Sequence, residues 1–278
     1  MKTSLEELVK KITNFINVTM EEKGFERLVL GLSGGIDSAV VALLCKKALA
    51  KSNKNEKNLL GLLMPSSTSS EESLKDAKEL CQKHNIDSKL ASIESMDKDF
   101  IKEYPEASPL QRGNFCARLR MATLYYHSSL TNALVVGTSN KSELLLGYGT
   151  MHGDLACAFN PISSLYKSDI FVLAKFLGVP DSILTKPPSA DLFANQKDED
   201  EIGYKYEDID RFLKDYTNFK SLEALSLKEV YESVEFRALK DIYGESMTKS
   251  LISRIKLNAF KKEGTKFFDI PNLELERD

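Results

Sequence analysis

Apolar residues in the first part of the chain follow two alternating spacings. From residue 4 to residue 22 they recur every three or four positions, which predicts an amphipathic helix that ends at Gly24. A short continuous apolar run at 28–32 is typical of a buried strand, and the turn 33–35, with two glycines, precedes a helical pattern over 38–50. The predicted order is therefore strand, glycine turn and helix.

The same order repeats further along the chain. A second strand is predicted at 59–64, followed by a helix that begins with the capping box Ser69-x-x-Glu72 and ends near His84. The next predicted elements are a strand at 89–93, helices at 95–103 and 114–130, and a strand at 133–137. This alternation predicts an α/β fold: a Rossmann-like parallel sheet covered by helices on both faces, with a helical C-terminal part.

Residues beyond Gly147 have a different pattern. A polar, glycine-rich loop comes first, and helices are then predicted at 167–177, from a capping box at Ser226, and at 246–262. Residues 186–205 lack a helical or strand pattern, and we expect them to form a lid, because long irregular segments in compact domains commonly do.

Neither composition nor an internal repeat marks a domain boundary. Residues 1–278 are therefore predicted to form a single domain. Within it, we expect a core over about residues 25–180, and the lid and helical C-terminal part over about residues 181–278.

Composition narrows the class of protein. The 278 residues carry 38 Lys and Arg against 41 Asp and Glu, a net charge of −3, and 42% of them are hydrophobic. That balance disfavours a nucleic-acid partner, and no apolar run approaches the roughly 18 residues that a membrane helix needs. The charged, helically spaced N-terminus is also unlike a secretory signal. We expect a cytoplasmic globular protein with neither a nucleic acid nor a membrane as partner.

The four cysteines contain no closely spaced pair; they are Cys45, Cys81, Cys116 and Cys157. Three of them fall in apolar periodic stretches, and a zinc site would need paired ligands. We therefore expect reduced, mostly buried thiols.

The strongest chemical signal is the glycine turn after the first strand, which reads Gly31-Leu32-Ser33-Gly34-Gly35-Ile36-Asp37-Ser38. In a parallel sheet this turn lies at the carboxyl edge, where its N–H groups and the following helix start favour an anion such as phosphate. A carboxylate about 4 Å from a phosphate oxygen would cost roughly 4 kcal/mol at an effective dielectric of about 20. Asp37 therefore predicts a Mg²⁺ ion between the two. A Walker lysine is absent, so attack at the γ-phosphate is not implied.

The string Ser33–Ser38 resembles the pyrophosphate loop of the N-type ATP pyrophosphatases, in which a substrate oxygen attacks the α-phosphorus of ATP. Further strings, in order along residues 5–215, are similar to the ammonia-dependent NAD synthetases of that superfamily. These strings are Gly113–Met121, Val136–Glu143, Gly147–Thr150, Gly153-Asp154, Pro161, Leu165–Lys167, Pro188–Leu192, Gln196-x-Asp198-Glu199 and Ile202–Asp210.

The resemblance implies a ligase that forms an amide in two steps. ATP adenylates the nicotinate carboxylate of deamido-NAD and releases pyrophosphate, and ammonia then displaces AMP to give NAD. Mg²⁺ is the implied cofactor. A homodimer is implied, with the N-terminal helix and the helix at 114–130 as candidate interface elements and deamido-NAD near the interface. Ammonia rather than glutamine is expected, because the loop starts at Ser33 and leaves no length before it for a glutaminase domain.

The resemblance also implies site residues. ATP would be bound by residues Gly31 to Ser38, Thr138, Lys167 and Ser189; Mg²⁺ by Asp37 and Glu143; and deamido-NAD by Asn114 and Arg118. The catalytic residues would be Asp154, which binds or deprotonates ammonium, and Lys167. The role of Arg120 stays open between this site and a surface salt bridge.

The chain departs from the family pattern at the nicotinate end of the implied site. Met151 and His152 occupy positions where many members have Lys and Tyr, and Ala158 stands where many have Asp. The C-terminal His-Lys-Arg signature is absent, and Phe260–Lys262 is a candidate replacement. Contacts at this end therefore stay open.

Two alternative functions are weighed. One is another pyrophosphate-loop adenylating ligase, including a tRNA thiolase, which the cysteine spacing and negative net charge disfavour. The other is a non-catalytic nucleotide-binding module, which would have no need to keep Asp37, Glu143 and Lys167.

Overall fold

The computed structural model describes residues 3–52, 56–189 and 198–263. Its centre is a four-stranded parallel sheet in the order β3-β2-β1-β4. The strands are β1 (Arg27–Gly31), β2 (Leu59–Leu63), β3 (Asp87–Leu90) and β4 (Ala133–Val135). Leu28 of β1 stands beside Leu59 of β2 on one side and Leu134 of β4 on the other. The predicted α/β fold with a parallel sheet is confirmed.

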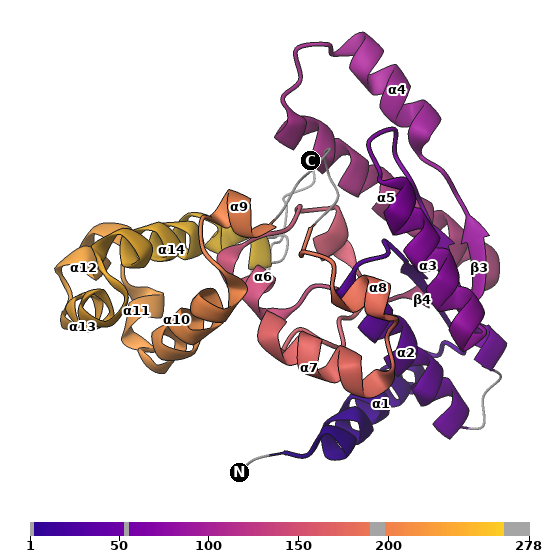
Figure 1. Ribbon diagram of the computed structural model, residues 1–278, viewed down its shortest axis with the longest axis horizontal. Coiled ribbons are helices and arrows are strands. Elements are labelled where there is room, and N and C mark those ends of the chain that lie inside the picture. Colours follow the sequence, from indigo (N-terminus) through magenta and orange to yellow (C-terminus); the bar gives the residue numbers. More distant parts are fainter. Residues whose placement is uncertain (1–2, 53–55, 190–197, 264–278) are drawn as a thin grey trace, which may run out of the picture.

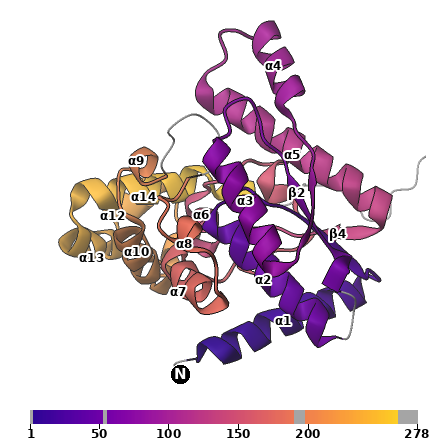
Figure 2. The same ribbon diagram turned by 45° about the vertical axis from the view of Figure 1, so that its right-hand side comes forward.

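Helices cover both faces of the sheet, as predicted. The helices of this part are α1 (Leu5–Glu22), α2 (Ile36–Lys51), α3 (Glu71–His84), α4 (Glu94–Glu103), α5 (Pro109–Thr131), α6 (Lys141–Leu146), α7 (Lys167–Leu177) and α8 (Asp181–Leu184). Figure 1 shows α4 and the start of α5 projecting to one side of the sheet, and Figure 2 shows α1 lying along α2.

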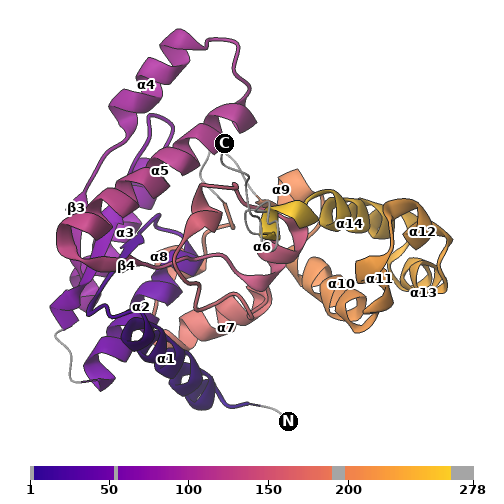
Figure 3. The ribbon, with the colours of Figure 1, turned by 180° about the vertical axis from the view of Figure 1, so that it is seen from behind.

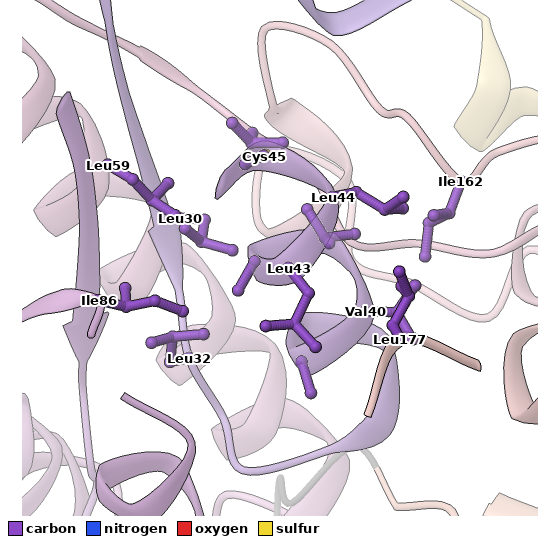
Figure 4. Close-up of a cluster of buried hydrophobic side chains, with 14 of the residues drawn as sticks. Leu30, Leu32, Val40, Leu43, Leu44, Cys45, Leu59, Ile86, Ile162 and Leu177 are labelled. Atoms are coloured by element: carbon purple, nitrogen blue, oxygen red, sulfur yellow. The ribbon is translucent and has the colours of Figure 1, made fainter. Parts of the chain in front are cut away.

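Alternation along the strands divides the core between the two faces. Leu28 and Leu30 pack with α2, α3 and α7, whereas Val29 packs with α5 on the opposite face. Figure 4 shows Leu30 and Leu59 from the sheet on one side of α2, and Ile162 and Leu177 on the other side, next to Leu44 and Val40. Helix α2 is apolar on nearly every side, because it lies between the sheet, α1 and α7.

The C-terminal residues form a separate helical group with its own apolar core. Its helices are α9 (Asp198–Ile202), α10 (Tyr206–Asn218), α11 (Ser221–Ala224), α12 (Leu227–Glu232), α13 (Val234–Tyr243) and α14 (Glu245–Leu257), followed by the 3₁₀ turn Ala259–Lys262. Phe212, Leu239 and Leu251 are buried at its centre. Figure 3 shows these helices gathered on one side of the sheet, next to α6. None of the helices in the described residues is long and apolar enough to span a membrane.

Several predicted boundaries were wrong. Helix α3 is capped by Ser70, whose side chain accepts from the Ser73 N–H, so the helix starts one residue later than the Ser69 box implied. Strand β3 begins two residues earlier and ends three residues earlier than the strand predicted at 89–93, because all four of its residues are exposed at the sheet edge and few of them are apolar. Asp198–Ile202 form a helix inside the segment predicted to be irregular. Of the remaining residues of the predicted lid, 186–189 and 203–205 are described and contain no helix or strand, whereas residues 190–197 lie outside the described residues.

Candidate active site

A cavity of about 920 Å³ opens at the carboxyl ends of the strands. One wall is the loop from Gly31 to Ser38, and others come from the turn after β2, the segment after β4, and helices α5 and α14. This is the edge at which parallel sheets bind ligands, and its volume is in the range of small-molecule sites. We refer to the part beside residues 31–38 as the phosphate end, and to the part beside residues 147–154 as the acceptor end.

The phosphate end is built on a tight turn. Gly34 has a φ of +79°, and a Cβ atom there would stand 2.1 Å from the Ser73 carbonyl oxygen, so only glycine fits. The Ser33 hydroxyl accepts from the Gly35 N–H at 3.1 Å, and the Ser38 hydroxyl donates to the Gly35 carbonyl at 2.9 Å. Helix α2 then begins without a side-chain cap, so its first N–H groups are available to an anion.

A buried lysine lies between two carboxylates beside this turn. The Lys167 ammonium is 2.5 Å from Asp37 Oδ2 and 3.2 Å from Glu143 Oε1, and only 3% of its side chain is exposed. Asn140 completes the arrangement: it donates to Asp37 Oδ1 at 2.9 Å and caps α6, the helix that carries Glu143. Three helices therefore fix the three charges relative to one another.

The charges at this point do not cancel. Asp198 is buried nearby, where the hydroxyl groups of Tyr148 and Tyr206 donate to it, so three carboxylates share the neighbourhood of one ammonium. Burial raises the pKa of Glu143 to about 8, and repulsion from Asp37 adds to the rise against the attraction of Lys167. Burial alone would lower the pKa of Lys167, but the surrounding carboxylates raise it, so the ammonium stays charged.

The residues present fit a divalent cation. The described residues contain no group of three or more His, Cys, Asp or Glu side chains arranged around one metal position. Two carboxylates beside a phosphate-binding turn are nevertheless the donor set that Mg²⁺ commonly uses, with the remaining positions taken by phosphate oxygens and water. The surplus negative charge around Asp37 and Glu143 is also what a cation would neutralise.

The wall after β2 is held by a second buried carboxylate. Asp97, from α4, accepts from the N–H and hydroxyl of Ser67 and from two nitrogens of Arg112, all within 2.9 Å. Burial opposes its ionisation, but the Arg112 and Ser67 hydrogen bonds hold the pKa of Asp97 well below its usual range. The turn that contributes Pro65 and Ser69 to the cavity is thereby fixed to α4 and α5.

The acceptor end is held mainly through backbone atoms. Asp154 Oδ1 accepts from the Thr150 N–H at 2.8 Å, and the Thr150 hydroxyl donates to Asn114 Oδ1 at 2.7 Å. Lys261 donates to the carbonyl groups of Gly147 and Gly149 at 2.9 and 3.1 Å. Asp154 faces the cavity, whose walls exclude enough water to raise the pKa of its carboxyl group, against the hydrogen bond from Thr150.

The structure brings nearly all of the predicted site residues together. The cavity is lined by Gly31 to Ser38, Asn114, Thr138, Glu143, Asp154, Lys167 and Ser189. Arg118 is the exception: it is exposed outside the lining of this cavity, and it donates to the carbonyl groups of Met151 and Asn114. The contact of Arg118 with Met151 uses only the backbone carbonyl of Met151, so another residue at position 151 could make the same contact.

Sequence reasoning missed several cavity residues. Arg120, whose role the sequence leaves open, lines the cavity and donates to the Met64 carbonyl and the Ser69 hydroxyl. Because Arg118 and Arg120 are two residues apart on a helix, the sequence predicted that they lie on different faces. It did not predict which of the two faces lines the cavity. Lys186 and Arg254 also line the cavity. Lys186 lies next to the string Pro188–Leu192, but the resemblance implies no role for it, and Arg254 lies in a predicted helix that carries no motif.

Comparison with known proteins agrees with this geometry. A model of the NAD synthase family matches residues 8–263. An NH3-dependent NAD synthetase of Wolinella succinogenes is 46% identical over 92% of this chain and 93% of its own length. Two solved structures cover nearly the whole of both chains. An NH3-dependent NAD synthetase from Campylobacter jejuni, in complex with nitrate, matches 96% of this chain and 100% of its own at 38% identity and a TM-score of 0.73. An NMN synthetase from Francisella tularensis matches 98% and 100% at 31% identity and a TM-score of 0.72.

Proposed function

The chain belongs to the NAD synthase family, and we propose that it is an ammonia-dependent NAD synthetase, a ligase that converts deamido-NAD, ATP and ammonia to NAD, AMP and pyrophosphate. The observation that carries the proposal is the bridge that Lys167 makes between Asp37 and Glu143 beside the phosphate turn. Lys167 at this point would neutralise phosphate charge on ATP, which attack at the α-phosphorus needs. This buried cluster of charges also argues against a non-catalytic nucleotide-binding module, because such a module has no need of it.

At the phosphate end, residues 31–38 would hold the β and γ phosphates through backbone N–H groups and the start of α2. Thr138 and Ser189 line the same end and would contact the phosphates or the ribose. Asp37 and Glu143 would hold Mg²⁺, which when bound neutralises phosphate charge and makes pyrophosphate a better leaving group. Lys167 would stabilise negative charge on the α-phosphoryl group while a carboxylate oxygen of deamido-NAD attacks it.

At the acceptor end, Asn114 and Arg118 would bind deamido-NAD, and Asp154 would serve the second step. The raised pKa of Asp154 suits a general base, because a carboxylate that holds a proton more tightly removes one from ammonium more readily. The neutral ammonia then attacks the adenylated carbonyl carbon, AMP leaves, and the nitrogen loses a further proton. Lys261 supports this end by fixing the carbonyl groups of Gly147 and Gly149.

A homodimer is part of the proposal. Large apolar side chains are exposed along α5, namely Leu110, Tyr125, Tyr126 and Leu130, and on α1, namely Phe15 and Val18. A surface of this kind would be buried by a second copy. Arg118 projects from the same helix outside the cavity of its own chain, so a dimer through α5 would place it near the interface, where deamido-NAD is expected. Sedimentation at micromolar concentration should give twice the chain mass, and a monomer would contradict this part.

The test is to incubate the protein with ATP, Mg²⁺, ammonium and deamido-NAD and to quantify the products. NAD and AMP should form in equal amounts, and glutamine at the same concentration should support much less. ADP in place of AMP would refute adenylation. Nicotinate mononucleotide is the competing substrate to include, because the similar Francisella protein is described as an NMN synthetase and this chain departs from the family at Met151 and Ala158. Higher kcat/KM with that substrate would replace deamido-NAD in the proposal.

A further inference from the structure

A second lysine lies at the phosphate end, and the reaction as proposed above gives it no role. Lys186 follows α8 and lines the cavity. Its ammonium donates to the Ser73 hydroxyl at 2.7 Å and to Asp76 Oδ2 at 3.2 Å, both on α3 and more than a hundred residues away in sequence. The contact fixes Lys186 against the first two turns of α3, although 21% of its side chain stays exposed.

The position of Ser73 places this lysine beside the phosphate turn. The Ser73 carbonyl oxygen contacts Gly34 so closely that no side chain fits between them. Lys186 therefore bonds a residue whose backbone packs against Gly34, whereas Lys167 bonds Asp37, a residue of the loop itself. Lys186 is thus on the side of Gly34, and Lys167 on the side of Asp37, in the loop 31–38.

The bonding of the two lysines differs in a way that matters for an anion. Lys167 is buried and already pairs with two carboxylates, Asp37 and Glu143. Lys186 has one carboxylate partner and one neutral partner, and an ammonium group has three N–H donors. Its third donor meets no acceptor in the described part of the chain and lies on a residue that lines the cavity. A phosphate oxygen on the turn is an acceptor of the right charge.

We propose that Lys186 is a phosphate-binding residue that contacts the pyrophosphate portion of ATP at the Gly34 end of the loop, with Ser73 and Asp76 holding it in position. The inference rests on the proposed function, since it concerns the same ATP site. It assigns Lys186 to binding the leaving group rather than to the α-phosphoryl centre. Pyrophosphate affinity should therefore depend on Lys186 more than affinity for deamido-NAD does.

The competing explanation is that Lys186 only neutralises Asp76. That carboxylate has just 4% of its side chain exposed, so removing its cation leaves a buried charge unpaired and could weaken the whole fold. A double variant separates the two explanations. In Lys186→Met combined with Asp76→Asn, the buried carboxylate is removed together with its cation. The variant therefore has no unpaired buried charge to destabilise it, but it still lacks the phosphate contact.

The experiment measures binding of inorganic pyrophosphate in the presence of Mg²⁺ by calorimetry, with thermal unfolding of each variant alongside. Lys186→Met should weaken binding about ten- to hundredfold, the range expected for one charged hydrogen bond, and Lys186→Arg should recover part of it. The double variant should unfold near the temperature of the unaltered protein yet bind pyrophosphate as weakly as Lys186→Met. Lys175→Met, which removes an exposed lysine of α7 outside the cavity, should bind normally.

Restored affinity in the double variant, or unchanged affinity in Lys186→Met, would overturn the inference and leave Lys186 as a partner of Asp76 alone. Failure of the proposed function looks different: the unaltered protein would then form no NAD. If only the inference fails, the unaltered protein forms NAD, and Lys186→Met binds pyrophosphate as tightly as the unaltered protein does.

Discussion

The two ends of the cavity are held together by different kinds of bond. At the phosphate end, side chains bind side chains: Lys167 contacts Asp37 and Glu143, and each is fixed by its own helix. At the acceptor end, cations bind the backbone: Lys261 contacts the carbonyl groups of two glycines, and Arg118 those of Met151 and Asn114. A network of paired side chains requires a particular residue type at each of its positions. A backbone carbonyl group, in contrast, can accept from a cation on any segment that reaches it.

The largest difference between the two ends should appear in stability. Lys167→Met leaves two buried carboxylates without their cation, which we expect to lower the free energy of unfolding by about 3–5 kcal/mol. Lys261→Met leaves carbonyl groups that water can reach, and should cost less than about 1.5 kcal/mol. Urea denaturation of both variants without Mg²⁺ makes the comparison. Equal losses would mean that the acceptor end is as tightly specified as the phosphate end.

Catalysis should depend on the two carboxylates at the phosphate end. Asp37→Asn and Glu143→Gln are each expected to lower kcat by at least about a hundredfold, the scale of losing a main charge-stabilising group. Circular dichroism should confirm that both variants fold. Asp181→Asn, in an exposed first turn outside the cavity, is the matched control and should keep normal turnover. Near-normal turnover in either cavity variant removes that residue from the metal site.

The raised pKa of Glu143 gives the phosphate end a pH signature of its own. A carboxyl group that ionises near pH 8 when folded and at its ordinary value of 4.5 when unfolded contributes stability below about pH 4.5, and loses it as pH rises toward 8. The stability of the metal-free protein minus that of Glu143→Gln should therefore fall across this range. Taking the difference removes the histidines, which act in the opposite direction. A difference independent of pH would show that Glu143 is not enclosed as described.

The smallest effect should follow from changing the exposed arginine at the acceptor end. Arg118→Met is expected to raise KM for deamido-NAD about tenfold, the value of one charged hydrogen bond at a partly exposed site, while kcat and KM for ATP change less than about twofold. Arg118→Lys keeps the positive charge, and its KM for deamido-NAD should lie between those of the unaltered protein and Arg118→Met. If KM for ATP rises as much as KM for deamido-NAD, the division of the cavity into two ends fails.

The same contrast explains what could be predicted from the sequence. Residues 31–38 and the surrounding strand and helix are contiguous, so their spacing alone indicated the phosphate turn. Phe260–Lys262 was a candidate from its place near the C-terminus, but not the contact that Lys261 makes with Gly147, 114 residues away. Lys186 likewise reaches Ser73 across 113 residues, and no local pattern shows where a distant segment folds back. Strand β3 was misplaced for a related reason: its register against β2 fixes it, while its own exposed residues carry no apolar signal.

The central claim is that the phosphate end activates a carboxylate that is held at the acceptor end. Deamido-NAD labelled with ¹⁸O at both oxygens of its nicotinate carboxylate tests this directly, because adenylation joins one carboxylate oxygen to the α-phosphorus and ammonia then cleaves the bond between carbon and that oxygen. We predict that mass spectrometry of the products, after reaction with ATP, Mg²⁺ and ammonium, will find one ¹⁸O in each AMP and none in pyrophosphate. Label in pyrophosphate or orthophosphate, or AMP without label, would contradict the account.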